Sequence, residues 1–183
     1  MLMNNKFPDR KTLRYKHFDY NDGIVFITIC TKNRKQILSK TVGTDVPGGP
    51  HVELTHYGKI VNKYINQLND FYEHVEVPYY VIMPNHIHLL LFIKATDRRG
   101  RRSLQDNVTT SPSASVEKDP KASATSKFIS TLKRFCNKEI GVNIFQRSYF
   151  DHIIRSDDDL DMHIDYILRN PENWFYDELY SNE

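Results

Sequence analysis

The sequence predicts a mixed α+β domain built on an antiparallel sheet. Two observations lead to this prediction. Strand-like and helix-like segments alternate along the chain, and the two central strands are separated by a turn of only two residues, Pro84 and Asn85. Turns this short join antiparallel neighbours. The chain has 183 residues, 39% hydrophobic and 12% aromatic, so we expect 1–183 to form a single domain.

The first half of the chain contains three predicted strands and one helix. Residues 23–31 (GIVFITICT) are β-branched and aromatic, which is typical of a buried strand. Residues 41–50 (TVGTDVPGGP) form a turn-rich connection. Thr55 can then cap a helix that runs to about Tyr72, and the apolar spacing places four side chains on one face of it: Ile60, Tyr64, Leu68 and Phe71.

Two further strands flank the two-residue turn. Residues 75–83 form the second strand, and Pro78 within it indicates a sheet edge or a bulge. Residues 86–93 form the third strand. The next segment, 95–125, has no aromatic residue and is rich in Ser, Thr, Ala and charge, so we expect it to be a flexible insertion.

The second half contains two predicted helices and one strand. Residues 126–138 form a basic amphipathic helix with Phe128, Leu132 and Phe135 on its apolar side, and a fourth strand lies within 143–155. Ser156 caps a last helix that Pro171 ends, and its predicted sheet-facing stripe is Leu160, Ile164 and Leu168. The order β-α-β-β-α-β is that of a ferredoxin-like fold, an antiparallel sheet with helices on one face, here with an added C-terminal helix.

Composition excludes several classes of protein. No apolar run approaches the ~20 residues that a membrane helix needs, and the first residues lack the apolar stretch of a signal peptide. Cys30 and Cys136 are too few for a disulfide framework, so we expect reduced thiols in a cytoplasmic protein. The net charge of +2 conceals segregation, because residues 1–40 carry +6 and 94–138 carry +7 while 139–183 carry −8. This clustering favours a polyanion partner such as nucleic acid, although solvated faces would also explain it.

One constellation has the chemistry of a metal site. His86 and His88 lie two apart on a strand, so they face the same way and can converge on one ion, or they are merely two hydrogen-bonded sheet histidines. Tyr166 and Asn170 lie one turn apart on the last helix. Two imidazoles and an amide oxygen form a mixed site that suits Mg²⁺ or Mn²⁺ better than zinc. The alternative is that Tyr166 is one of eleven ordinary tyrosines and Asn170 a helix-end residue.

Three segments together resemble a known family. Residues 80–90 (YVIMPNHIHLL) are similar to the His-hydrophobe-His (HUH) motif of single-tyrosine transposases. Residues 145–155 (FQRSYFDHIIR) and 163–171 (HIDYILRNP) resemble the segments that flank and carry that family's tyrosine. The stretch 14–34 resembles the subgroup of REP-associated tyrosine transposases. The long 95–125 insertion and the 41–50 turn depart from the family pattern.

The resemblance implies a function and a set of site residues. His86, His88 and Asn170 would be metal ligands, and Tyr166 the nucleophile. The activity would be cleavage and rejoining of single-stranded DNA next to hairpins through a 5′-phosphotyrosine, with Mg²⁺ or Mn²⁺ as cofactor and either a homodimer or a monomer as the active species. His152 and Tyr149 are auxiliary candidates in the motif region.

The basic segments are the candidate DNA-binding surface. The residues we assign to it are Arg10, Lys11, Arg14, Lys127, Lys133, Arg134 and Lys138. Tyr149 and Phe150 could stack on unpaired bases or pack in the core. The alternative function is a non-catalytic single-stranded nucleic-acid-binding module on a ferredoxin-like sheet. A metal-dependent hydrolase is a third reading, but it would want a carboxylate where Leu90 stands.

Overall fold

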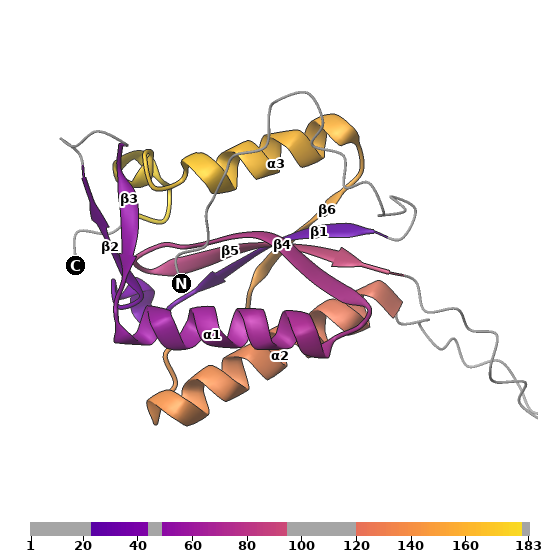
Figure 1. Ribbon diagram of the computed structural model, residues 1–183, viewed down its shortest axis with the longest axis horizontal. Helices are drawn as coiled ribbons and strands as arrows, with labels where there is room; N and C mark the ends of the chain where they lie inside the picture. Colours follow the sequence, from indigo (N-terminus) through magenta and orange to yellow (C-terminus); the bar gives the residue numbers. More distant parts are fainter. Residues whose placement is uncertain (1–22, 44–48, 95–119, 181–183) are drawn as a thin grey trace, which may run out of the picture.

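The computed structural model describes residues 23–43, 49–94 and 120–180, which form a four-stranded antiparallel sheet with a helical layer on each face (Figure 1). The strands lie in the order β4-β5-β1-β6. Their bounds are Ile24–Cys30 (β1), Val75–Ile82 (β4), His86–Ile93 (β5) and Phe150–Ile154 (β6). This order and the antiparallel pairing are those of the ferredoxin-like fold, so the predicted α+β class is confirmed.

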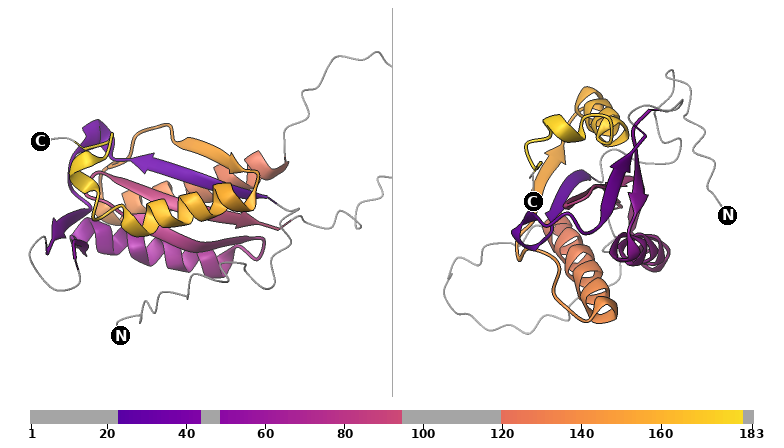
Figure 2. Two further views of the ribbon diagram at one scale, coloured as in Figure 1. Left: turned by 90° about the horizontal axis from the view of Figure 1, so that it is seen from above. Right: turned by 90° about the vertical axis from the view of Figure 1, so that its left-hand side faces the viewer.

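The helices divide between the two faces of the sheet. Helices α1 (His56–Phe71) and α2 (Pro120–Ile140) cover one face, and α3 (Asp157–Arg169) crosses the other (Figures 1 and 2). Each face therefore has its own apolar cluster, which we call the α1/α2 cluster on one face and the α3 cluster on the other. In the part of the chain that the structure describes, no helix is long and apolar enough to cross a membrane.

Strand β5 is buried along its whole length because it lies between both layers. Its side chains alternate: Ile87 and Leu89 enter the α1/α2 cluster, whereas Leu90 and Phe92 enter the α3 cluster. His86 and His88 share the face of Leu90. The sequence pattern thus places both imidazoles beneath α3, as the predicted alternation requires.

Helix α1 begins and ends where the sequence predicts, but its buried face is displaced. Thr55 caps the helix and its side chain accepts a hydrogen bond from the Gly58 amide at 3.2 Å. The buried residues are Gly58, Ile60, Val61, Ile65 and Leu68. The predicted stripe was wrong at its end, because Phe71 is 75% exposed. Val61 and Ile65 take its place in the core.

Helix α2 begins earlier than the composition predicts. Its first residue, Pro120, falls inside the segment expected to be a flexible insertion, and Thr125 is buried. Residues 120–125 are therefore helical, which corrects that boundary; residues 95–119 lie outside the described part of the chain. The predicted apolar side is confirmed, since Phe128 and Leu132 are fully buried.

The connection at 41–50 is the end of a hairpin that the sequence analysis missed. Strands β2 (Ser39–Val42) and β3 (His51–Leu54) pair antiparallel around it. Four-residue strands with few apolar side chains give too weak a periodic signal to be recognised. The expected role of Pro78 is confirmed, because β4 is an edge strand and its register shifts between Glu76 and Tyr79.

Helix α3 has the predicted cap and a slightly rotated buried face. The Ser156 side chain accepts a hydrogen bond from the Asp159 amide at 3.2 Å. Leu160, Ile164 and Ile167 are buried, whereas the predicted Leu168 is 38% exposed. Ile167 packs in the α3 cluster instead.

Candidate active site

His86 is fixed at the start of β5 in one tautomer. Its Nδ1 lies 2.8 Å from Asn85 Oδ1, and Asn85 in turn donates from Nδ2 to the Leu179 carbonyl at 2.7 Å. Because this second bond orients the amide, the oxygen faces the ring and Nδ1 must carry the proton. The lone pair is left on Nε2, which is the protonation state of a metal ligand.

His88 is oriented by the neighbouring strand. Its Nδ1 is hydrogen-bonded to Thr28 Oγ1 at 2.9 Å, across the register that pairs Thr28 with His88. The rings of His86 and His88 lie 4.5 Å apart between centroids. Nε2 of each histidine is buried and has no hydrogen-bond partner among the described residues.

Both histidines are neutral at neutral pH. The pKa of His86 is lowered to about 4, chiefly by burial; the charge of Asp177 opposes this shift and that of Arg34 contributes to it. Burial also holds the pKa of His88 well below its ordinary value, with His86 and His163 as further causes. Each ring therefore keeps a free lone pair.

Helix α3 brings Tyr166 and Asn170 to the same place. The rings of Tyr166 and His88 are 5.1 Å apart between centroids. Asn170 ends the helix and is only 2% exposed, because Ile164 and Ile167 press this part of α3 onto the sheet. Its Oδ1 has no partner within the described chain. One subunit thus unites the two histidines of β5 with the two polar residues of α3.

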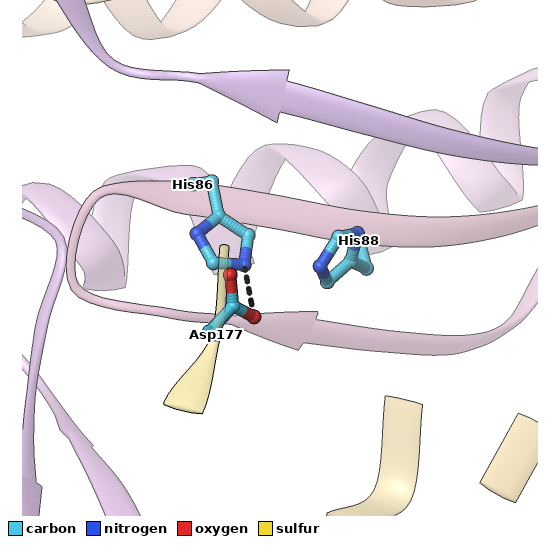
Figure 3. A group of neighbouring side chains, drawn as sticks. All are labelled: His86, His88 and Asp177. Atoms are coloured by element: carbon cyan, nitrogen blue, oxygen red, sulfur yellow. Dashed lines mark ion pairs between the residues drawn. The ribbon is translucent and has the colours of Figure 1, made fainter. Parts of the chain in front are cut away.

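Asp177 completes the cluster, and the sequence analysis missed it. Its side chain is 3% exposed, and Oδ2 lies 3.9 Å from His86 Nε2 (Figure 3). The same oxygen accepts hydrogen bonds from Tyr166 Oη at 3.3 Å and Asn170 Nδ2 at 3.2 Å. No spacing rule connects Asp177 to the histidines. A 3₁₀ turn, η2 (Trp174–Tyr176), places Asp177 beside the histidines, and the buried Trp174 anchors this turn.

A cleft of about 680 Å³ opens above these residues. Its lining includes Phe26, His88, Phe150, His163, Tyr166 and Asp177. Tyr166 is 43% exposed, so its hydroxyl can meet a ligand in the cleft. Burial raises the pKa of Tyr166 to about 12, and the nearby charge of Asp177 adds to the effect.

The residues present fit a divalent cation. The described chain has four buried side-chain N or O atoms without hydrogen-bond partners, and three belong to this site: His86 Nε2, His88 Nε2 and Asn170 Oδ1. Leaving such atoms unpaired is costly unless a ligand satisfies them. Ligand atoms of His86, His88 and Asp177 all lie within 4.8 Å of one another. Imidazole nitrogens with amide and carboxylate oxygens suit Mn²⁺ or Mg²⁺.

Comparison with known proteins identifies the fold. A solved REP-associated tyrosine transposase bound to a REP hairpin superposes with a TM-score of 0.55 at 18% identity, over 91% of this chain and 77% of that chain. The chain has the fold of a REP-associated tyrosine transposase. This confirms, at the level of the fold, the resemblance recognised in the sequence.

Other comparisons are weaker. A candidate transposase from Deinococcus radiodurans R1 matches with a TM-score of 0.39 and 18% identity, over 86% of this chain and 97% of that one. An uncharacterized protein of Haemophilus influenzae is 28% identical over 174 residues, 93% of each chain. No protein-family profile matches the sequence.

The structure separates the two auxiliary candidates from the candidate metal ligands. Tyr149 packs against the α1/α2 cluster, on the other face of the sheet, and its hydroxyl is hydrogen-bonded to Ser126 at 3.0 Å. Phe150, next in sequence, is 64% exposed and lines the cleft. His152 pairs with Asp159 at 3.0 Å, beside His163. The spacing that linked Tyr166 and Asn170 would also have found His163, which lies on the same face of α3.

The candidate DNA-binding residues lie away from the cleft or outside the described chain. Lys127, Arg134 and Lys138 are exposed on α2, which covers the opposite face of the sheet. Lys133 differs, because its ammonium donates to the carbonyls of Gln146, Arg147 and Ser148 at 2.9, 3.3 and 2.9 Å. It secures the segment before β6. Arg10, Lys11 and Arg14 lie outside the described residues.

Proposed function

We propose that the chain is a metal-dependent transposase that cleaves and rejoins single-stranded DNA beside hairpins through a 5′-phosphotyrosine. One observation carries the proposal: three buried, unpaired ligand atoms converge beside the partly exposed hydroxyl-bearing ring of Tyr166. A module that only binds nucleic acid has no need of this arrangement, whose desolvation cost is of the order of 1–3 kcal/mol for each unpaired atom.

Each residue has a defined part in this reaction. His86, His88 and Asn170 would hold Mg²⁺ or Mn²⁺ with Asp177 beside them, and the ion would supply polarisation of the scissile phosphate. Tyr166 Oη attacks phosphorus, the new O–P bond forms, and the bond from phosphorus to the 3′ oxygen breaks. That oxygen takes up a proton from water as it leaves and becomes a 3′-hydroxyl. Rejoining is the reverse attack by a 3′-hydroxyl, so no ATP is needed.

The hydroxyl proton of Tyr166 needs an acceptor. With a pKa of about 12, Tyr166 is a phenol at neutral pH, so its proton leaves as the attack proceeds. Asp177 Oδ2 already accepts its hydrogen bond at 3.3 Å and is positioned to receive the proton. The sequence did not predict this role for Asp177.

The proposed partner is a DNA hairpin with an unpaired flank. The fold neighbour is bound to a REP hairpin, and this cleft has exposed aromatic side chains on which unpaired bases can stack. Phe150 and Tyr176 are 64% and 89% exposed at its rim. Aromatic stacking tolerates any base, so these residues contribute affinity rather than sequence choice.

The decisive experiment is incubation with end-labelled, hairpin-containing single-stranded DNA and Mn²⁺ or Mg²⁺. We expect a covalent protein–DNA adduct that protease removes and that excess EDTA prevents. Tyr166→Phe should abolish the adduct while hairpin binding persists, and Tyr149→Phe, the matched control, should form it normally. DNA binding without an adduct in the wild type would instead support the non-catalytic binding module.

A further inference from the structure

A second group of metal-ligating side chains joins β6 to α3. His152 lies on β6, and Asp159 and His163 lie one turn apart on α3. The imidazole planes of His152 and His163 are stacked, with centroids 4.9 Å apart and 14° between the planes. Ligand atoms of all three residues lie within 4.8 Å of one another.

Distances within this group suit coordination. His152 Nε2 lies 3.1 and 3.0 Å from Asp159 Oδ1 and Oδ2. His163 Nδ1 donates to the Asp159 main-chain carbonyl at 2.8 Å, so its lone pair is on Nε2, the atom through which His163 would bind a metal. Two ligand atoms bound about 2.1 Å from one ion at angles of about 90–109° are separated by about 3.0–3.4 Å, given ordinary zinc–nitrogen and zinc–oxygen distances. The separation of His152 Nε2 from the Asp159 carboxylate therefore already matches an occupied site.

The carboxylate at the centre is ionised. Burial by itself would raise the pKa of Asp159, but hydrogen bonds from His152 and the Arg155 amide outweigh it and bring the pKa below its ordinary value. Asp157 and Asp158 in the same first turn add negative charge. The surroundings thus favour a cation.

This group is distinct from the candidate metal ligands of β5. The ring of Phe26 lies between them, 5.1 Å from the ring of His88 and 4.6 Å from that of His163. An ion at one place cannot share ligands with the other. His163 is one helical turn before Tyr166, so whatever fixes His163 also fixes the tyrosine-bearing turn of α3.

We propose that His152, Asp159 and His163 form a second binding site, for a divalent transition-metal ion of the zinc type, that ties β6 to α3. Two imidazoles and one carboxylate, with a remaining position for water or a ligand, are a common zinc donor set. The site stands whether or not the chain is a transposase, because it uses neither Tyr166 nor the candidate metal ligands of the proposed reaction.

Zinc titration of the full chain without a histidine tag tests the proposal. By calorimetry, His152→Ala and His163→Ala should each bind one Zn²⁺ fewer per chain than the wild type. Asp159→Asn, which keeps an oxygen for the Arg155 amide, should weaken this site about tenfold or more, in line with the sensitivity of metal sites to their carboxylates. His51→Ala, an exposed histidine on β3, is the matched control and should bind as the wild type does.

A second readout separates this site from that of His86 and His88. Zn²⁺ should raise the melting temperature of His88→Ala, and it should not do so in the double variant His88→Ala/His152→Ala. Equal zinc stoichiometry in the wild type and His152→Ala would overturn the proposal. So would the absence of zinc binding by His88→Ala, since only the β5 site would then bind metal.

Discussion

Two buried histidines at the candidate site lower the stability of the folded chain. His86 and His88 are held neutral in a buried position, where each Nε2 lacks a hydrogen-bond partner in the described chain. A leucine at either position would pack in the α3 cluster without the free-energy cost of burying an unpaired polar atom. This loss of stability becomes measurable in acid, because the imidazole binds a proton in the unfolded state at a pH where it stays neutral in the folded state.

The pH dependence of unfolding follows from this difference. An unfolded histidine is protonated near pH 6.5, whereas folded His86 is protonated only near its pKa of about 4. Between these values the unfolded state binds more protons, so the free energy of unfolding falls as the pH drops from 6.5 towards 4. We expect a loss of about 1.4 kcal/mol per pH unit for each such histidine. Urea titrations with EDTA at pH 7, 6 and 5 measure it.

Variants distinguish the buried histidines from the other groups that titrate in this range. His86→Gln should reduce the pH slope of the free energy of unfolding by about 1.4 kcal/mol per pH unit. His51→Gln, at an exposed position, is the matched control for the loss of a histidine. An identical slope in His86→Gln and the wild type would contradict the neutral, buried state of this ring.

Which site residues the sequence could reveal depends on whether they lie on one periodic element. His86 and His88 were predictable from strand alternation, and Tyr166 and Asn170 from the helical repeat. Asp177 has no such relation, because an irregular turn brings it to the histidines through long-range packing of Trp174. The carbonyl contacts of Lys133 were hidden for the same reason, since they depend on where the chain passes after α2.

At the scale of elements, the rotation of α3 about its axis decides where Tyr166 points. Ile167 is 2% exposed and Leu168 38%, the reverse of the stripe expected from sequence. Both residues are large and apolar, so periodicity alone could not choose between them. The packing of α3 on β5 and β4 determines which of the two side chains is buried.

Truncating these two neighbours tests that rotation. Ile167→Ala should lower the free energy of unfolding by about 2–5 kcal/mol, because it opens a cavity in the α3 cluster. Leu168→Ala should cost less than about 1 kcal/mol, as expected of a partly exposed side chain. Chemical denaturation of both variants measures the difference. Equal losses would mean that α3 is rotated from the position described.

Helix α2 combines a structural cation with solvent-exposed ones. Lys133 donates to three carbonyls of the segment before β6, whereas Arg134 is exposed. Lys133→Ala should therefore lower the free energy of unfolding by about 1–3 kcal/mol, because the hydrogen bonds of a charged donor are lost. Arg134→Ala should leave stability unchanged and, if α2 contacts DNA, reduce the log–log salt slope of single-strand binding by about 0.7. An unchanged slope would place the DNA elsewhere.

At the scale of the whole molecule, the sheet separates two surfaces. Helix α3 lies on one face of the sheet and α2 on the other (Figure 1). The cleft is lined by Tyr166 of α3, whereas the exposed cations belong to α2. A DNA strand that reaches both must pass around an edge of the sheet. The acidic helix α3 and the basic helix α2 thus lie on opposite faces of the sheet, a segregation that the net charge of +2 conceals.

The cleft is also complete within one chain. Tyr166 lies beside His88 of its own subunit, and Asp177 contacts both Tyr166 and the candidate ligand Asn170. We therefore predict that a single chain forms the phosphotyrosine adduct without exchanging α3 with a second copy. Mixing Tyr166→Phe with His88→Ala distinguishes the two cases, because only helix exchange reunites an intact tyrosine with intact histidines. We expect no adduct in the mixture and an adduct yield proportional to wild-type concentration. Adduct formation by the mixture would show that the working site is shared between subunits.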